Sequence, residues 1–144
     1  MKPDPVAYLT RRATFSASHR LYSVHLSDAE NRELFGKCAR DNGHGHNYVL
    51  EVTLRAAIHP HTGIIMDLNR LKDAIQTAVL DRVDHWHLNK DVPPFDRIIP
   101  TVENMAVVFW EWLQAALPAG LLYEIVLWET ENNKAVYRGE QGAS

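Results

Sequence analysis

The stretch from His44 to Ala56 alternates between two kinds of side chain, and this pattern constrains the fold more than any other feature of the chain. Every second residue from His44 is histidine, tyrosine or aliphatic, whereas the residues between them are mostly polar. Alternation with a period of two is typical of a strand that buries one face. Because side chains two positions apart on a strand point the same way, we expect His44 and His46 to point together toward the apolar side.

A second alternating run, residues 8–19, also ends in a histidine. Its apolar face carries Phe15, Ala17 and finally His19. If this strand pairs antiparallel with the strand that begins at His44, the end of the first lies beside the start of the second. The sequence therefore predicts that three histidines meet at one end of a strand pair.

These three histidines, His19, His44 and His46, suggest a metal site. Buried imidazoles without hydrogen-bond partners are costly, and imidazole is a common ligand of zinc. Three protein ligands leave a fourth position open, which is typical of a catalytic zinc ion. We predict bound Zn²⁺ at this point. Four other histidines are interpreted as ordinary core or surface residues: His25, His59, His61 and His87.

The single cysteine, Cys38, lies between Lys37 and Arg40, shortly before the second strand. A free cysteine is commonly a small buried filler. Here, cationic neighbours and a nearby dication are expected to lower the pKa of the thiol and favour a thiolate, which acts as a base or a nucleophile. A role for Cys38 as a fourth zinc ligand stays open. One cysteine forms no internal disulfide.

Two carboxylates also stand out. Asp84 precedes His85 directly, and only a turn there would let it orient the imidazole, as in a thiol–histidine–carboxylate relay. Glu129 ends an apolar stripe in a strand expected at 121–131. It is either a strand-end residue in contact with water or an acceptor for two adjacent N–H groups, such as a pterin or guanine edge offers.

Helix signals complete the pattern. Ser27 and Glu30 form a capping box for a short helix that ends near Gly36. Longer helices are expected from Asp67 through about 83 and from Thr101 to about 117. A strand at 121–131 and a short one at 134–138 follow. We predict one α+β domain over residues 1–144, an antiparallel four-stranded sheet with two long helices on one face.

The strand at 121–129 is apolar on both sides, which bears on assembly. One side is expected to carry Tyr123, Ile125 and Leu127, and the other Leu122, Val126 and Trp128. Helices on one face would leave the second set in water, so we expect a homo-oligomer that covers it.

Composition excludes several classes of protein. The net charge of −3 over 144 residues indicates neither a nucleic-acid partner nor an anionic membrane surface. No apolar run approaches a membrane span, and the start of the chain lacks the apolar core of a signal peptide. We expect a cytoplasmic enzyme or binding protein.

Five motifs, taken together and in order, resemble the 6-pyruvoyl-tetrahydropterin synthase family over about residues 8–140. The combination is much more specific than any one motif. The motifs are Phe15-Ser-Ala-Ser-His19-Arg-Leu, Cys38-x5-His44-Gly-His46-Asn-Tyr, Val83-Asp84-His85-x2-Leu-Asn, Thr101-x-Glu103-Asn104 and Trp128-Glu129-Thr130.

The resemblance implies a tunnelling fold, in which protomers join their sheets into an oligomeric barrel. It implies a homohexamer of two trimers with active sites at subunit interfaces. The implied reaction converts 7,8-dihydroneopterin triphosphate to 6-pyruvoyl-tetrahydropterin with loss of triphosphate. No redox cofactor is implied, because the pterin ring takes up reducing equivalents from its own side chain.

The resemblance also assigns residues. Glu129, matching the pterin anchor, is counted among both the catalytic and the substrate-binding groups, and Val102 stands where the family has a second threonine. The other matches are the zinc ligands His19, His44 and His46, the general base Cys38, the relay pair Asp84 and His85, and the pterin-site helper Thr101.

Four alternatives stay open. Relatives that make 6-carboxy-tetrahydropterin for queuosine-type nucleosides have a shorter gap between the cysteine and the His-Gly-His unit, so the gap here favours the pyruvoyl product. Relatives that cleave the side chain often carry glutamate in place of the cysteine, which Cys38 disfavours. The residue types alone also allow a thiol hydrolase with Cys38 as nucleophile, or a non-catalytic pterin- or purine-binding module.

Overall fold

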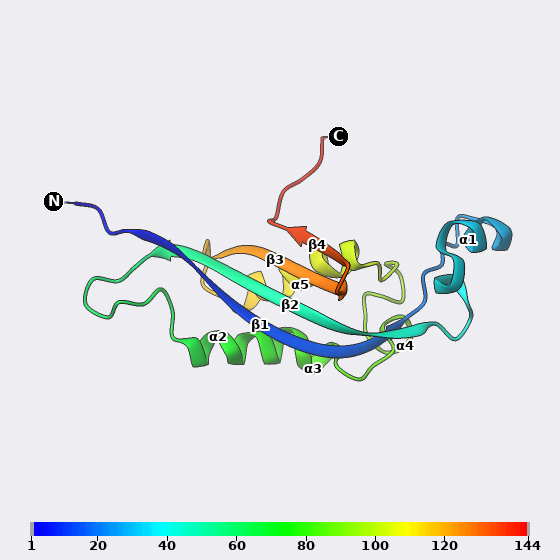
Figure 1. Ribbon diagram of the computed structural model, residues 1–144, viewed down its shortest axis with the longest axis horizontal. Coiled ribbons are helices and arrows are strands. Elements are labelled where there is room, and N and C mark those ends of the chain that lie inside the picture. The colour runs from blue at the N-terminus through cyan, green and yellow to red at the C-terminus, as the bar shows by residue number, and fades with distance from the viewer. Residues whose placement is uncertain (1, 144) are drawn as a thin grey trace.

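Two long antiparallel strands form the frame of the molecule, which a computed structural model describes over residues 2–143 (Figure 1). Strand β1 (Val6–His19) pairs with β2 (His44–Ala57) along its whole length, from Val6 opposite Ala57 to His19 opposite His44. The two expected strands and their antiparallel register are therefore confirmed. Four apolar side chains on the inner face of β2 are fully buried, as the alternation predicts: Tyr48, Leu50, Val52 and Leu54.

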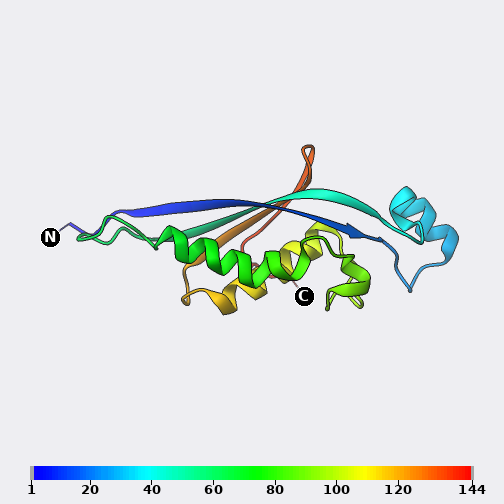
Figure 2. The ribbon, with the colours of Figure 1, turned by 90° about the horizontal axis from the view of Figure 1, so that it is seen from below.

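The sheet is completed by β3 (Leu122–Thr130) and β4 (Asn133–Tyr137), and its order is β1-β2-β3-β4 with every neighbouring pair antiparallel. Figure 2 shows the long helices on one side of this sheet. The α+β prediction, an antiparallel four-stranded sheet with helices on one face, is confirmed. Among residues 2–143, no helix is long and apolar enough to cross a membrane.

The helices follow the capping signals with two additions. Ser27 and Glu30 form the expected capping box, and the Thr101 hydroxyl accepts a hydrogen bond from Asn104 N–H at the start of the last helix. The helix after Asp67 contains a π-helical stretch, and the segment after His87 forms an additional short helix. The helices are α1 (Asp28–Phe35), the 3-10 helix η1 (Gly36–Ala39), α2 (Leu68–Ile75), the π-helical η2 (Gln76–Leu80), α3 (Asp81–Val83), α4 (Leu88–Asp91) and α5 (Val102–Ala116).

The core lies between the sheet and the continuous helix formed by α2, η2 and α3, together with α5. Large apolar side chains from both layers are buried there, and they account for most of the hydrophobic stabilisation, about 25 cal/mol per Å² of apolar area removed from water. Its largest members include Phe95, Phe109, Leu71, Ile75, Leu113 and Leu127.

At the start of β3, Leu122 and Tyr123 lie on the faces opposite to those expected from the sequence. Leu122 packs in the core, whereas Tyr123 contacts the Tyr8 ring on the opposite face, at 4.9 Å between centroids. The cause is a β-bulge, because the register with β2 shifts between Thr53 and Leu54. One extra residue in a bulge moves the preceding side chains to the other face, so the sequence assignment of these two residues was wrong.

The face of the sheet away from the helices carries both polar groups and exposed apolar side chains. Val6, Tyr8 and Val136 are each about half exposed there. Trp128 also lies on this face and donates its indole N–H to Glu51. The oligomer expected to cover this face stays a prediction.

Candidate functional site

The three strand histidines meet at one end of the β1–β2 pair. His19 lies opposite His44 in the register, and Ala17, two residues earlier, lies opposite His46. Ring centroids are 4.7–5.1 Å apart, and one ligand atom from each residue lies within 4.8 Å of the others. The prediction that they form one cluster able to hold a metal ion is confirmed.

His19 is held with one ring nitrogen free for a metal. Its Nδ1–H donates to the Pro100 carbonyl at 2.8 Å, so in the neutral imidazole Nε2 carries the lone pair. The side chain is fully buried, and burial, followed by the charges of neighbouring histidines, lowers its pKa to about 4. Burial likewise lowers the pKa of His46. Neutral imidazoles are the form that binds metals.

The buried ring nitrogens of the cluster indicate that a cation fits between the three histidines. Within residues 2–143, Nε2 of His19 and Nε2 of His46 are buried and have no hydrogen-bond partner. Such orphaned acceptors are costly in a finished core. A cation that accepts their lone pairs removes this cost, and a carbonyl that fixes the tautomer of the ligand is a common outer partner of metal-bound histidine.

The start of α5 positions that carbonyl. Thr101 is the N-cap residue, and Asn104 both donates its backbone N–H to the Thr101 hydroxyl and donates its side-chain amide to the Ile99 carbonyl. These bonds fix the 99–101 segment, and Pro100 between them presents its oxygen to His19. Thr101 therefore lies next to the cluster, with its hydroxyl oxygen already accepting one hydrogen bond.

Cys38 lies in η1 rather than in an open loop. Its Sγ is 3.7 Å from Nε2 of His44, so the thiol touches the cluster. Burial and then the charge of Glu129 raise the pKa of the Cys38 thiol. Without a metal ion, burial and this carboxylate thus outweigh the exposed cations Lys37 and Arg40, and the lowering of the pKa expected from the two cations together with a dication stays a prediction. A bound dication would act in the opposite direction to the carboxylate.

Glu129 faces the histidines and not open water. Its Oε2 lies 4.0 Å from Nε2 of His19, and the side chain is 20% exposed. The register between β3 and β4 is irregular between Trp128 and Thr130, on either side of this residue. A carboxylate in this position can accept hydrogen bonds from a ligand that lies over the histidine cluster.

Asp84 and His85 are fixed at the free edge of β1. The Asp84 carboxylate accepts the Ser16 backbone N–H at 2.9 Å and lies 2.9 Å from Nδ1 of His85, while His85 N–H donates to the Ser16 carbonyl. His85 has φ +69°, a strained conformation for a non-glycine residue that is typical of functional sites. The structure has the turn that an Asp84–His85 interaction requires.

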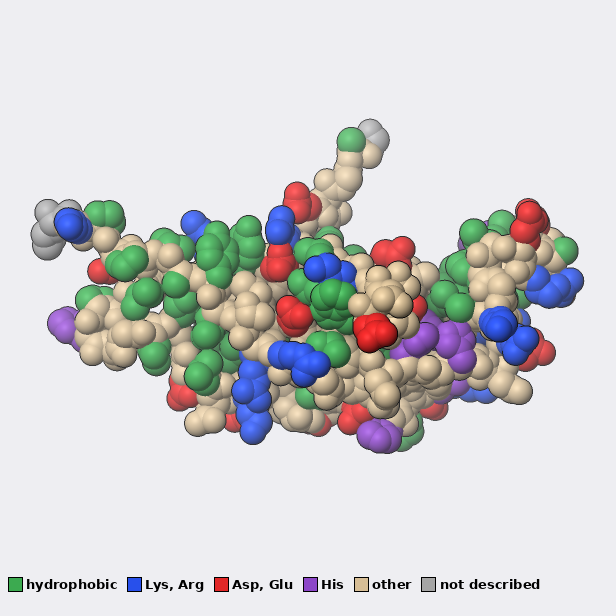
Figure 3. Space-filling model, in the orientation of Figure 1, with side chains coloured by type: hydrophobic (Ala, Val, Ile, Leu, Met, Phe, Trp, Pro, Cys, Tyr) green, Lys and Arg blue, Asp and Glu red, His purple; other side chains and the backbone are tan. Residues whose placement is uncertain are grey.

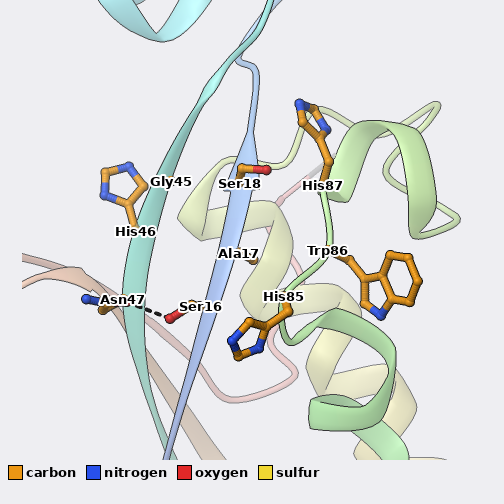
Figure 4. A pocket seen from close by; sticks show the side chains of 9 residues that line it. All are labelled: Ser16, Ala17, Ser18, Gly45, His46, Asn47, His85, Trp86 and His87. Atoms are coloured by element: carbon orange, nitrogen blue, oxygen red, sulfur yellow. Dashed lines mark hydrogen bonds between the residues drawn. The ribbon is translucent and has the colours of Figure 1, made fainter.

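The two halves of the expected relay do not meet within one chain. In the part of the chain that the structure describes, no hydrogen bond joins Cys38 to Asp84 or His85. Figure 4 shows His46 beside β2 and His85 beside β1, across the strand pair. Between them is a shallow cavity of about 340 Å³, where Gly45 leaves the sheet uncovered. The His85 side chain is 81% exposed.

His87 belongs to this region, which the sequence analysis missed. Both of its ring nitrogens are buried without a hydrogen-bond partner among residues 2–143, and its charge contributes to the lowered pKa of His19. Its placement follows from a bridge between Ser18 and His87 at the edge of β1, for which the sequence carries no signal. Gly43 is also required here, because a Cβ at φ +68° would lie 2.3 Å from the His19 carbonyl oxygen.

Comparisons with known proteins point to one family. The chain matches the family described as 6-pyruvoyl tetrahydropterin synthase over residues 8–140. The human 6-pyruvoyl tetrahydrobiopterin synthase is 51% identical, covering 93% of this chain and 92% of that protein. The solved structure of the Caenorhabditis elegans 6-pyruvoyl tetrahydropterin synthase has a TM-score of 0.93 at 43% identity, covering 97% of this chain and 100% of that chain. The Aquifex aeolicus 6-carboxy-5,6,7,8-tetrahydropterin synthase is 28% identical over 92% of this chain.

Proposed function

The chain belongs to the 6-pyruvoyl tetrahydropterin synthase family, and we propose that it converts 7,8-dihydroneopterin triphosphate to 6-pyruvoyl-tetrahydropterin with release of triphosphate. The observation that carries this proposal is a cluster of three histidines with a thiol and a carboxylate against it. The protein would then be a carbon–oxygen lyase of tetrahydrobiopterin-type biosynthesis in the cytoplasm.

Zn²⁺ is the metal that suits three imidazoles with an open fourth position. His19, His44 and His46 would hold it, and the orphaned Nε2 atoms of His19 and His46 support that fit. When bound, zinc would supply a Lewis acid for the oxygens of the substrate side chain. The Pro100 carbonyl keeps the proton of His19 on Nδ1, which leaves the inner nitrogen available to the metal.

Side chains of the protein would bind the pterin ring and transfer protons. Glu129 would accept two N–H groups of the pterin ring, and Thr101, beside Pro100, would assist in the same pocket. Cys38 would remove a proton from the substrate side chain once it is a thiolate. Asp84 would hold the imidazole of His85 in one orientation, so that His85 can receive and return a proton.

Because Cys38 and the Asp84–His85 pair are not joined within one chain, we assign the relay to two protomers. The His85 side chain is 81% exposed beside β1, so a neighbouring chain can reach it. The proposed assembly is the tunnelling-fold barrel, a homohexamer of two trimers. Mixing Cys38→Ala with His85→Ala protein should restore part of the activity that each variant lacks alone, since some interfaces then hold both intact groups.

One experiment tests the reaction itself. Purified protein is incubated with 7,8-dihydroneopterin triphosphate, and the pterin product is identified by mass while released triphosphate is quantified. A pyruvoyl product supports the proposal, and Cys38→Ala serves as the matched inactive control. A 6-carboxy product would place the chain with the queuosine-type enzymes, and absence of triphosphate release would refute the lyase assignment.

A further inference from the structure

A second, larger cavity is lined by the two neighbours of Cys38 in the sequence, Lys37 and Ala39. It has a volume of about 600 Å³ and is formed between the end of β1, α1 and η1. Four of the residues that line it are cationic: Arg20, Arg32, Lys37 and Arg40. Figure 3 shows Lys and Arg side chains gathered over the α1 end of the molecule, next to a group of histidine side chains.

The acidic side chains that line the same cavity are already engaged. Asp28 accepts the hydrogen bond of the Tyr22 hydroxyl, and Asp41 pairs with Arg20 at 3.0 Å. Arg32, Lys37 and Arg40 have no ion pair with any of residues 2–143. Three cations without an ion-pair partner around one cavity create a positive potential that favours an anion of multiple charge.

Arg20 forms the rigid wall of the cavity. Its Nε–H donates to the Ala39 carbonyl, and its guanidinium lies over the Tyr22 ring at 4.1 Å. The Leu21 N–H donates to the Cys38 carbonyl at 2.8 Å, which ties the end of β1 to η1. The guanidinium is thus held by contacts on two sides, and a prearranged cation loses little freedom when a phosphate binds.

The cavity adjoins the site through the chain itself. Arg20 directly follows the ligand candidate His19, and Lys37 directly precedes Cys38. Consecutive Cα atoms are about 3.8 Å apart. The backbone that carries the cavity is thus continuous with the backbone of the site, and a substrate bound at the histidine cluster can extend its side chain toward these cations.

We propose that this cationic cavity binds the triphosphate group of the substrate. The identity of the anion rests on the proposed function. A condensed phosphate fits this cavity because cations from three separate elements can each contact one of its charged groups. Arg20 would be the fixed contact, and the flexible side chains of Arg32, Lys37 and Arg40 would close around the remaining charges. These residues bind the anion and take no part in proton transfer.

The test uses inorganic triphosphate alone, without pterin, so that it does not depend on turnover. Its affinity is measured by calorimetry for the wild-type protein and for the double variant Lys37→Gln/Arg40→Gln. A second variant, Arg32→Gln, removes a cation from α1 only. The matched control, Arg70→Gln/Lys72→Gln, removes two exposed cations of α2 that lie outside this cavity.

A charge-assisted contact to phosphate is worth at least about tenfold in affinity. We expect about a hundredfold loss in the double variant, about tenfold in Arg32→Gln, and less than threefold in the control, with binding of unphosphorylated 7,8-dihydroneopterin unchanged throughout. Equal triphosphate affinity in the wild type and the double variant would overturn the assignment, even if the protein turns over the substrate. Conversely, triphosphate binding with these losses in a protein that forms no pyruvoyl product would uphold the cavity and refute the proposed reaction.

Discussion

Acidification should lower the free energy of unfolding of the metal-free protein, because His19 is buried in its neutral form. The size of this effect can be worked out from the shift in the pKa of His19 on folding. Folding lowers the pKa of His19 from about 6.5 to about 4, because the ring is buried among other histidines. Between these two values the unfolded chain binds more protons than the folded one, so stability falls as pH falls. The contribution of His19 to the free energy of unfolding is fully present above about pH 7. On acidification this free energy falls by about 2 kcal/mol at pH 5 and by about 3 kcal/mol at pH 4.

The assay is urea unfolding of chelator-treated protein at pH 7.5 and pH 5.0, with His19→Gln as the comparison and His59→Gln as a control on an exposed turn. With a slope of about 2 kcal/mol per M urea, the His19 contribution shifts the midpoint by about 1 M. The wild type and His59→Gln should lose this increment on acidification, whereas His19→Gln should not. If His19→Gln shows the same pH dependence as the wild type, His19 is not the buried neutral group described here.

Further predictions concern Asn31, Gly43 and Asp84. Asn31 is fully buried and donates to three backbone carbonyls in the 23–27 segment, so Asn31→Ala should destabilise this segment by about 2 kcal/mol and raise its hydrogen-exchange rates, while Asn69→Ala at an exposed position should not. Gly43→Ala forces a Cβ against the His19 carbonyl and should lower zinc affinity in a metal-competition titration, with unchanged affinity counting against this close approach. Asp84→Asn should lower kcat by about 10- to 100-fold with zinc content unchanged, and an unchanged pH profile of kcat would speak against a role in orienting His85.

The histidine cluster could be predicted from the sequence because strand alternation and antiparallel pairing are local rules. His19 and His44 end two strands on their inner faces, and only one register brings both ends together. The short helix after Ser27 was likewise predictable, because its capping box is written in four consecutive residues.

Other parts of the site depend on contacts between distant segments. The Pro100 carbonyl accepts a hydrogen bond from His19, which lies 81 residues earlier in the sequence. No pattern of side chains predicts which backbone carbonyl will accept such a bond. The position of His87 follows from the way residues after Val83 pair with the free edge of β1. Tyr123 was assigned to the wrong face because a single extra residue in a bulge changes the alternation without any glycine or proline to mark it.

We propose that His19, His44 and His46 bind one metal ion while Cys38 acts beside it. Metal analysis of purified wild-type, His46→Ala and Cys38→Ala proteins, combined with the product assay, tests this most directly. We expect one zinc ion per chain in the wild type and in Cys38→Ala, loss of zinc in His46→Ala, and loss of turnover in both variants. Loss of zinc from Cys38→Ala, or full activity in a zinc-depleted wild type, would contradict it.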